Sequence, residues 1–494
     1  TDIIRSFSHS TFHASHHIAR INHADIMRDQ LLDARNDAKA VDTAARTDVD
    51  SPSNRRKDAA IMRQVINELQ KRYDLAMNPK GHPLVNFLGQ IGFTWMIGPG
   101  LAGTLINSSQ GPMFTMPWLG SKYGFKSANT ELASAYLMLT SARDNELNVH
   151  NWYDMEHSNR LIAHQKAMQA KSRTYDFIGA LQDLKNSGDI DVTQTHDLSA
   201  LTTLDFSDQY KSKLQKTWFN AMRMIAYPFH SAEVVNRQVS AKAAYELAFP
   251  KTGHAGAVAY AREAINATHF NYRSTNRARY MQGNMGRMLF MFRQYAANVL
   301  FLQGRAISQI MKGLAARKAG GKDSPEYQAA WEAAKMLGSI YGMHFVAAGA
   351  VGMPLFGAVE MMTNALFSGL GDDDDDPFDF RTTFRNALAD AVGPTAGEML
   401  SHGALRATPI DVSARMSIDV VDMLLPRTPD TESVGRRRFQ EIFAAAGGPM
   451  VSVFSNMYAG VGQMSQGKVY RGIETTMPKF MRDFMRGGRY LKSG

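Results

Sequence analysis

Residues 286–312 read GRMLFMFRQYAANVLFLQGRAISQIMK. Apolar side chains recur in this stretch at steps of three and four residues, which places them along one side of an α-helix. Alternation of β-branched residues, which would indicate strands, is scarce along the whole chain. The sequence therefore predicts an all-α protein with little or no β-sheet, in an extended or multi-lobed arrangement of many helices. The members of the stripe are Met288, Phe292, Tyr295, Val299, Leu302, Ala306 and Ile310.

The region around this stripe is strongly basic. Residues 264–322 contain ten Arg or Lys and no Asp or Glu. Long basic side chains beside an apolar stripe can keep their charge at lipid head groups or at DNA phosphates, and contact with a partner helix is equally open. The candidate phosphate-facing residues are Arg273, Arg277, Arg279, Arg287, Arg293, Arg305, Lys312, Arg317 and Lys318. The candidate apolar contact face is Met288, Phe292, Tyr295, Val299, Leu302 and Ile310.

Three segments are almost free of charge: 83–121, 336–371 and 442–467. A membrane-spanning helix needs about 20 predominantly apolar residues. The first segment is interrupted by Gly98-Pro99-Gly100, so it predicts a helical hairpin that is buried in protein or dips into a bilayer. In the second, residues 336–359 carry no charge and are long enough to span a bilayer, although their many Ala and Gly are only weakly hydrophobic.

We expect four consecutive regions along the chain. Residues 1–80 form a polar helical segment, and 81–262 form a helical domain that opens with the charge-poor hairpin. Residues 263–330 form the basic amphipathic region. Residues 331–494 hold the other two charge-poor segments and an acidic loop at 372–379. Because the chain starts at Thr1 and ends on Lys492-Ser493-Gly494, with no secretory leader at its start, we interpret it as part of a longer polypeptide.

The composition removes several classes of site. The chain has no cysteine, which excludes disulfides, cysteine-based metal sites and cysteine nucleophiles. The net charge of +9 favours attraction to nucleic acid or anionic lipid and says nothing about the fold. Five histidines between His9 and His23 predict a surface cluster more readily than a metal site, and the acidic run Asp372 to Asp376 lacks the spacing of a calcium loop. No catalytic, metal or cofactor site is predicted.

Several short strings, taken in order, resemble the C-terminal part of the large polyvalent, PLxRFG-type bacteriophage proteins. The resemblance covers roughly residues 60–490, although the PLxRFG string itself is absent. The strings are Asn107-Ser108-Ser109-Gln110-Gly111-Pro112, Met116-Pro117-Trp118-Leu119, Tyr123-Gly124, Glu233-Val234-Val235-Asn236-Arg237, Phe270-Asn271-Tyr272-Arg273, Asn276-Arg277, Gly286-Arg287, Phe292-Arg293-Gln294-Tyr295, the acidic run with Pro377-Phe378-Asp379-Phe380, Gly393-Pro394 and Asp411-Val412-Ser413-Ala414-Arg415.

This resemblance implies an internal virion, or ejection, protein of a short-tailed bacteriophage. Such proteins lie inside the capsid and then assemble in the host envelope, at the periplasm and inner membrane, as a conduit for the genome. The implied partners are other internal virion or core proteins, further copies of the chain, phage DNA and the host membrane.

No enzymatic activity is expected within this segment. Two alternatives stay open. One is a capsid inner-core protein that organises packaged DNA without membrane contact. The other is a fragment of a larger phage enzyme, such as a virion-packaged polymerase or a peptidoglycan hydrolase.

Overall fold

The computed structural model is all-α, as the sequence predicts, with no strand in the part of the chain that it describes. Two compact units share the chain, the first within Thr1–Phe87, Ala200–Ala221 and Arg273–Arg287, the second within Leu88–Ser199, Met222–Tyr272 and Met288–Gly494. Each unit combines segments that are not consecutive, and the four predicted regions stay a prediction. The described residues are 24–44, 53–77, 88–89, 91–92, 95, 101–140, 177–190, 213–272, 276–290, 293–367, 378–407, 413, 416–421, 453–478, 481–482 and 485.

The first unit is built on two paired helices, residues 24–44 and α2 (Ser53–Met77). They run antiparallel, since the hydroxyl of Tyr73, near the end of α2, donates to the carbonyl of Ala24 at the start of the other helix. A single neighbouring helix covers only a narrow strip of α2. Of the apolar side chains along α2, Ile66 is buried, whereas Ile61, Val65 and Leu69 are exposed.

Small side chains dominate the core of the second unit. A row of alanines on α11 (Lys213–Thr268), from Ala241 to Ala264, has no exposed surface, and small side chains let neighbouring helices approach closely. The bulkier core residues Phe114 and Leu119 come from the segment that precedes α6. The other helices of this unit are α4 (Leu101–Ser108), the π-helix η1 (Gly111–Thr115), α5 (Met116–Tyr123), α6 (Phe125–Thr140), α8 (Phe177–Asn186), α13 (Arg293–Gly320), α14 (Pro325–Ala348), η6 (Ala350–Gly352), α15 (Phe356–Phe367), α16 (Phe380–Val392), α17 (Pro394–His402), η7 (Ala404–Ala407) and α20 (Val469–Thr476).

Helix α11 contains two prolines, Pro228 and Pro250, a residue type that ordinarily breaks a helix. The backbone leaves helical geometry at Gly253 instead, with φ 67° and ψ −174°. Glycine reaches positive φ without the clash that a Cβ causes, so the turn forms at the residue that tolerates it and not at the nearby proline. The helix is thus two segments that meet at Gly253.

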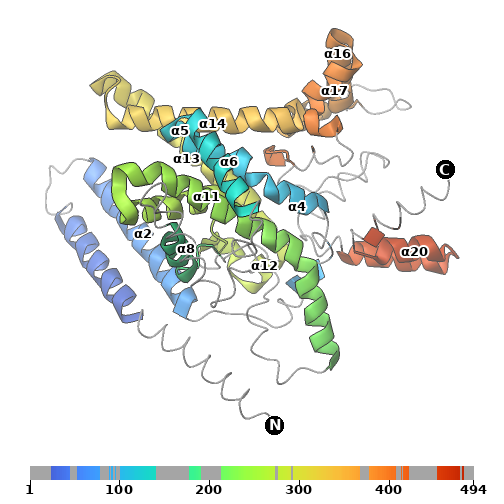
Figure 1. The fold of residues 1–494 in the computed structure, drawn as a ribbon, viewed down its shortest axis with the longest axis horizontal. Coiled ribbons are helices and arrows are strands. Elements are labelled where there is room, and N and C mark those ends of the chain that lie inside the picture. Colours follow the sequence, from blue (N-terminus) through green and yellow to red (C-terminus); the bar gives the residue numbers. More distant parts are fainter. Residues whose placement is uncertain are drawn as a thin grey trace. The chain divides into compact units, whose positions relative to one another are not determined.

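Helices α13 and α14 form a hairpin (Figure 1). The link between them is short, and the hydroxyl of Ser324 caps α14 by accepting from the backbone N–H of Tyr327. The two helices approach most closely at Gly313, where a Cβ would lie 2.1 Å from the Cβ of Ala330 and 2.6 Å from the carbonyl oxygen of Glu326. This contact requires glycine, because any side chain would force the helices apart.

Residues 336–359, which are long enough in sequence to span a bilayer, do not form one helix of that length. Helix α14 ends at Ala348, and Gly349 turns the chain with φ 67° before η6 and α15 follow. A Cβ on Gly349 would lie 2.4 Å from the backbone of Ser401. Both this close approach and the positive φ therefore require glycine at this position. In the part of the chain that the structure describes, no helix combines the length and apolar character that crossing a membrane requires.

The other charge-poor segments are only partly described. In the first, α4, η1 and α5 follow one another closely from Leu101 to Tyr123, and Gly98-Pro99-Gly100, where the hairpin was predicted to turn, lies outside the described residues. In the third, residues 453–465 are helical. Most of the acidic loop, 372–377, also lies outside the described residues.

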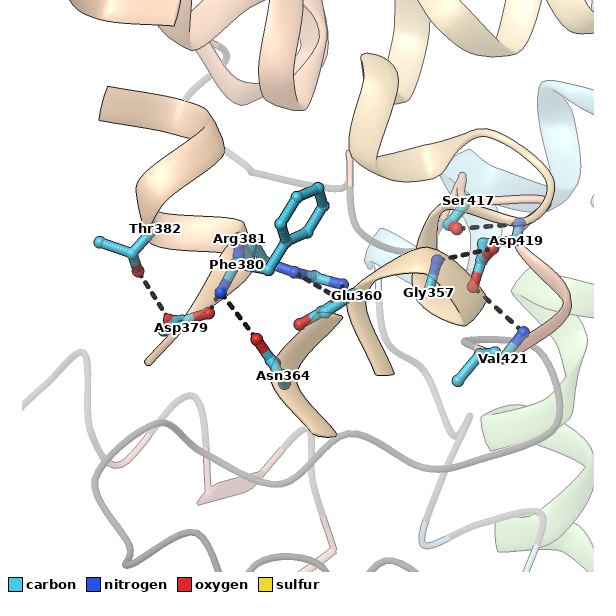
Figure 2. A network of polar contacts seen from close by, with 10 residues as sticks. All are labelled: Gly357, Glu360, Asn364, Asp379, Phe380, Arg381, Thr382, Ser417, Asp419 and Val421. Carbon is cyan, nitrogen blue, oxygen red and sulfur yellow. Dashed lines mark hydrogen bonds and ion pairs between the residues drawn. The ribbon is translucent and has the colours of Figure 1, made fainter. Parts of the chain in front are cut away.

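The junction of α15 and α16 is held by a network of polar contacts (Figure 2). Asp379 caps α16 by accepting from the backbone N–H of Arg381, whose guanidinium pairs with Glu360 on α15. Asp419, which has no exposed surface, accepts from the backbone N–H of Gly357 in the first turn of α15, where a negative charge is favoured. The Arg381–Glu360 ion pair therefore joins α16 to α15, and Asp419 joins residues 416–421 to the first turn of α15.

Two glycines of α13 give a matched test of the hairpin. We expect Gly313→Ala to lower the free energy of unfolding by about 1–3 kcal/mol through overpacking against α14. Gly304→Ala, at a position where a Cβ meets nothing within 4 Å, should raise it by up to about 1 kcal/mol through helix propensity. Urea denaturation followed by circular dichroism measures both, and equal effects of the two substitutions would contradict the close approach.

Candidate functional site

The predicted basic residues that the structure describes belong to two different units of the chain. Arg277 and Arg279 belong to the first unit, where Arg277 is buried with 6% of its surface exposed and Arg279 pairs with Glu68 at 3.5 Å. A buried guanidinium is a poor contact for lipid or DNA, so Arg277 does not fit the role predicted for it. Four others lie on α13 in the second unit: Arg293, Arg305, Lys312 and Arg317.

These four side chains differ in their exposure to solvent and in their contacts. Arg305 and Lys312 are exposed. Arg317 stacks on the ring of Tyr327, 5.5 Å from its centre, and Arg293 lies near Phe290, where burial lowers its pKa. Of the remaining predicted residues, Arg273 and Phe292 lie outside the described chain, and Arg287, Met288 and Lys318 lie on α12 (Asn284–Leu289) or α13 with side chains that the structure does not describe.

The predicted apolar face of α13 contacts protein in this structure. Val299 is fully buried, and Tyr295, Leu302 and Ile310 pack against the same core. Tyr295 lies edge-on to Phe114, with ring centres 6.4 Å apart, and burial raises the pKa of its phenol. The face thus holds α13 to its neighbours, and its contact with lipid or another chain stays a prediction.

A second apolar side of α13, not found from the stripe, faces solvent. Its large side chains are exposed by 47% to 63%: Phe301, Ile307, Met311 and Leu314. At about 100° per residue, Met311, Ile307 and Leu314 lie about 80°, 120° and 140° to one side of Phe301. Arg305 and Lys312 lie within about 40° on the other side of Phe301, at one edge of this apolar arc. Helix α13 contains no acidic residue. We call these six residues the basic-edged face.

The same unit contains a buried polar cluster around the π-helix η1. The imidazole of His269 lies between Gln110 and Ser240, with Nδ1 3.0 Å from Gln110 Oε1 and Nε2 2.6 Å from Ser240 Oγ. Thr115, the last residue of η1, lies 2.8 Å from Ser240 and donates to Thr268 at 3.0 Å. Burial and the nearby Arg237 together lower the pKa of His269 well below its usual value. The ring is therefore neutral at pH 7.

Arg237 connects the ends of two helices beside this cluster. It is 2% exposed, and its guanidinium donates to the carbonyls of His269 and Phe270, just after α11, and of Asp189, just after α8. The carbonyls in the last turn of a helix lack partners within the helix and carry partial negative charge. One buried cation therefore satisfies the C-terminal turns of α8 and α11 together. The Asp189 carboxylate, in turn, accepts from Arg262 at 2.7 Å.

The chain is strained where Arg237 binds it. Phe270 has φ 58°, a conformation that a bulky side chain adopts only when its surroundings impose it. Its carbonyl accepts from Arg237 at 2.8 Å, and its ring packs between those of Phe114 and Tyr295. These contacts hold the strained turn in place.

Three strings that carry the phage resemblance meet here. Asn236 donates to the carbonyl of Asn107, so the string 107–112 touches the string 233–237, and Arg237 binds the string 270–273 through Phe270. Of these three strings, sequence reasoning gave a candidate site residue only in the third, Arg273, and it predicted no buried cluster. The one available signal was a pair of ionisable residues, Glu233 and Arg237, four apart in a helix rich in alanine, which predicts a buried polar contact.

The chemistry of this cluster is that of a packed core. Ser240, His269 and the Gln110 amide stand in the order of a nucleophile, a base and an orienting group. Ser240 has no exposed surface and His269 only 2%, so a substrate cannot reach them in this structure. Among the described residues, no group of three or more His, Cys, Asp or Glu could hold a metal ion, and the N-terminal histidines lie outside that part.

Comparison with known proteins adds no relative. No protein-family model, curated protein or solved structure matches the chain.

The role of Arg237 is testable by substitution. Arg237→Met leaves three buried carbonyls without this donor, so we expect the free energy of unfolding to fall by about 3–5 kcal/mol. Arg305→Met, on the exposed side of α13, should change it by less than about 0.5 kcal/mol. Thermal unfolding and limited proteolysis compare the two variants. An equal loss of stability in both would contradict the capping role of Arg237.

Proposed function

We propose that this chain is an internal virion protein of a short-tailed bacteriophage, which acts in genome delivery by docking on the host membrane. The ordered strings that resemble PLxRFG-type phage proteins support the identity. The basic-edged face supports the docking, and it is the observation on which the proposal depends. The mode is peripheral: the helix lies at the membrane surface and does not cross it.

The side chains of the basic-edged face favour lipid over nucleic acid. Phe301 and Met311 are each 63% exposed, and large apolar side chains gain free energy by entering the acyl region of a bilayer. DNA phosphates offer them no such environment. Arg305 and Lys312, at the edge of the face, are placed to meet anionic head groups while their stems lie along the apolar surface.

Vesicle binding by charge-matched variants tests this function. A basic residue at an anionic membrane surface contributes about 1 kcal/mol, so Arg305→Gln with Lys312→Gln should weaken binding to phosphatidylglycerol-containing vesicles about 30-fold. Lys126→Gln with Lys468→Gln removes the same charge from exposed positions on other elements and should leave most of the affinity. Flotation over a lipid titration gives both affinities.

Two further measurements separate the alternatives. Phe301→Ser with Met311→Ser keeps the charge of the protein. It should also weaken vesicle binding, because the free energy gained by burying two large apolar side chains in the bilayer is lost. The proposal fails if the wild-type chain does not float with anionic vesicles. If it instead binds DNA with a steep salt dependence, the inner-core alternative is favoured.

A further inference from the structure

The π-helix η1 is enclosed by two buried histidines. His269 contacts Gln110, directly before η1, and Thr115, the last residue of η1. The ring of His344 on α14 packs against the ring of Phe114, with ring centres 5.3 Å apart. Single π-turns are rare and concentrate at functional sites. We propose that residues 110–123, η1 with α5, form an acid-released latch, which opens from α11 and α14 when His269 and His344 take up protons.

The hydrogen bonds of His269 allow its neutral form. Where Nδ1 donates to the amide oxygen of Gln110, Nε2 accepts from the hydroxyl of Ser240, whose single proton is then not available to Thr115. Among the described residues, no carboxylate bonds to the ring. The charged group that acts on it is Arg237, a cation, so a second positive charge here would be repelled.

Two further ionisable residues, Glu233 and Asp189, belong to the surroundings of Arg237. Glu233 is buried on α11 and interacts electrostatically with Tyr272, whose pKa is raised by burial. Asp189 is engaged by Arg262 and Ser187. Thr115, Ser240 and Thr268 are neutral hydroxyls that bond to one another or to backbone.

His344 lies in an environment that also disfavours charge. It is 2% exposed, and its Nδ1 donates to the carbonyl of Ile340 one turn earlier in α14. The ring faces Phe114, and burial lowers its pKa, although the bond to Ile340 opposes this in part. No charged side chain contributes to the shift. Protonation would place a bare cation against an aromatic core.

The direction of the pH effect follows from these environments. A released histidine binds a proton near its ordinary pKa of 6.5, whereas the closed latch resists protonation. The stability of the closed state is therefore complete above about pH 6.5 and declines as the pH falls below it. The strained turn at Phe270, directly after His269, favours opening once its contacts loosen.

Hydrogen exchange of residues 110–123 in the full chain tests the latch. Between pH 7.5 and pH 5.5, after correction for the intrinsic rate, the opening equilibrium constant should rise by up to about 10-fold for each histidine and by up to about 100-fold for both. His269→Gln or His344→Gln alone should reduce the rise to about 10-fold, and the double variant should remove it. His254→Gln, an exposed histidine on α11, is the matched control and should keep the full response.

Two results would overturn the proposal: a wild-type opening constant that is equal at the two pH values, or a rise that persists in both single variants at its full size. If the double variant does not fold at pH 7.5, the single variants decide. The inference is independent of the proposed function, since it concerns release of η1 and α5 and not vesicle binding by α13.

Discussion

The second unit depends on one buried guanidinium. Arg237 reaches the carbonyls that follow both α8 and α11, groups that have no helical partner and no access to water. Burying a cation is costly, and only several well-placed acceptors offset the cost. Because Phe270 adopts its strained turn on this cation, the position of His269 depends on it too. The polar cluster, η1 and the end of α11 are therefore one interdependent arrangement.

The sequence predicted the class of fold and several of its limits, because helical periodicity and turn residues are local properties. It did not predict where α11 breaks, since the choice between Pro250 and Gly253 depends on which backbone the surrounding helices accept. Nor did it predict the end of α14, because the need for glycine at Gly349 arises from its contact with Ser401, far away in the chain.

The candidate surface shows a similar limit. The stripe through Val299 and Ile310 correctly marks an apolar side of α13, but that side packs against the core. Periodicity cannot tell which of two apolar sides meets protein when a helix has both. Phe301 and Met311 were passed over because they lie off the stripe, and their exposure is a property of the hairpin with α14. The buried cluster was equally hidden, since Gln110 and Thr115 at η1 are more than a hundred positions from Ser240 and His269.

That separation has a consequence for the order of folding. Asn107 bonds to the carbonyl of Phe229, and Ser109 meets the sulfur of Met416, 307 positions later. At about 5–20 residues per second, a ribosome needs about 15–60 s to deliver the second partner after the first. Until α11 and α14 have been synthesised, the apolar segment around η1 lacks the helices that cover it, so the nascent chain exposes apolar surface that favours aggregation.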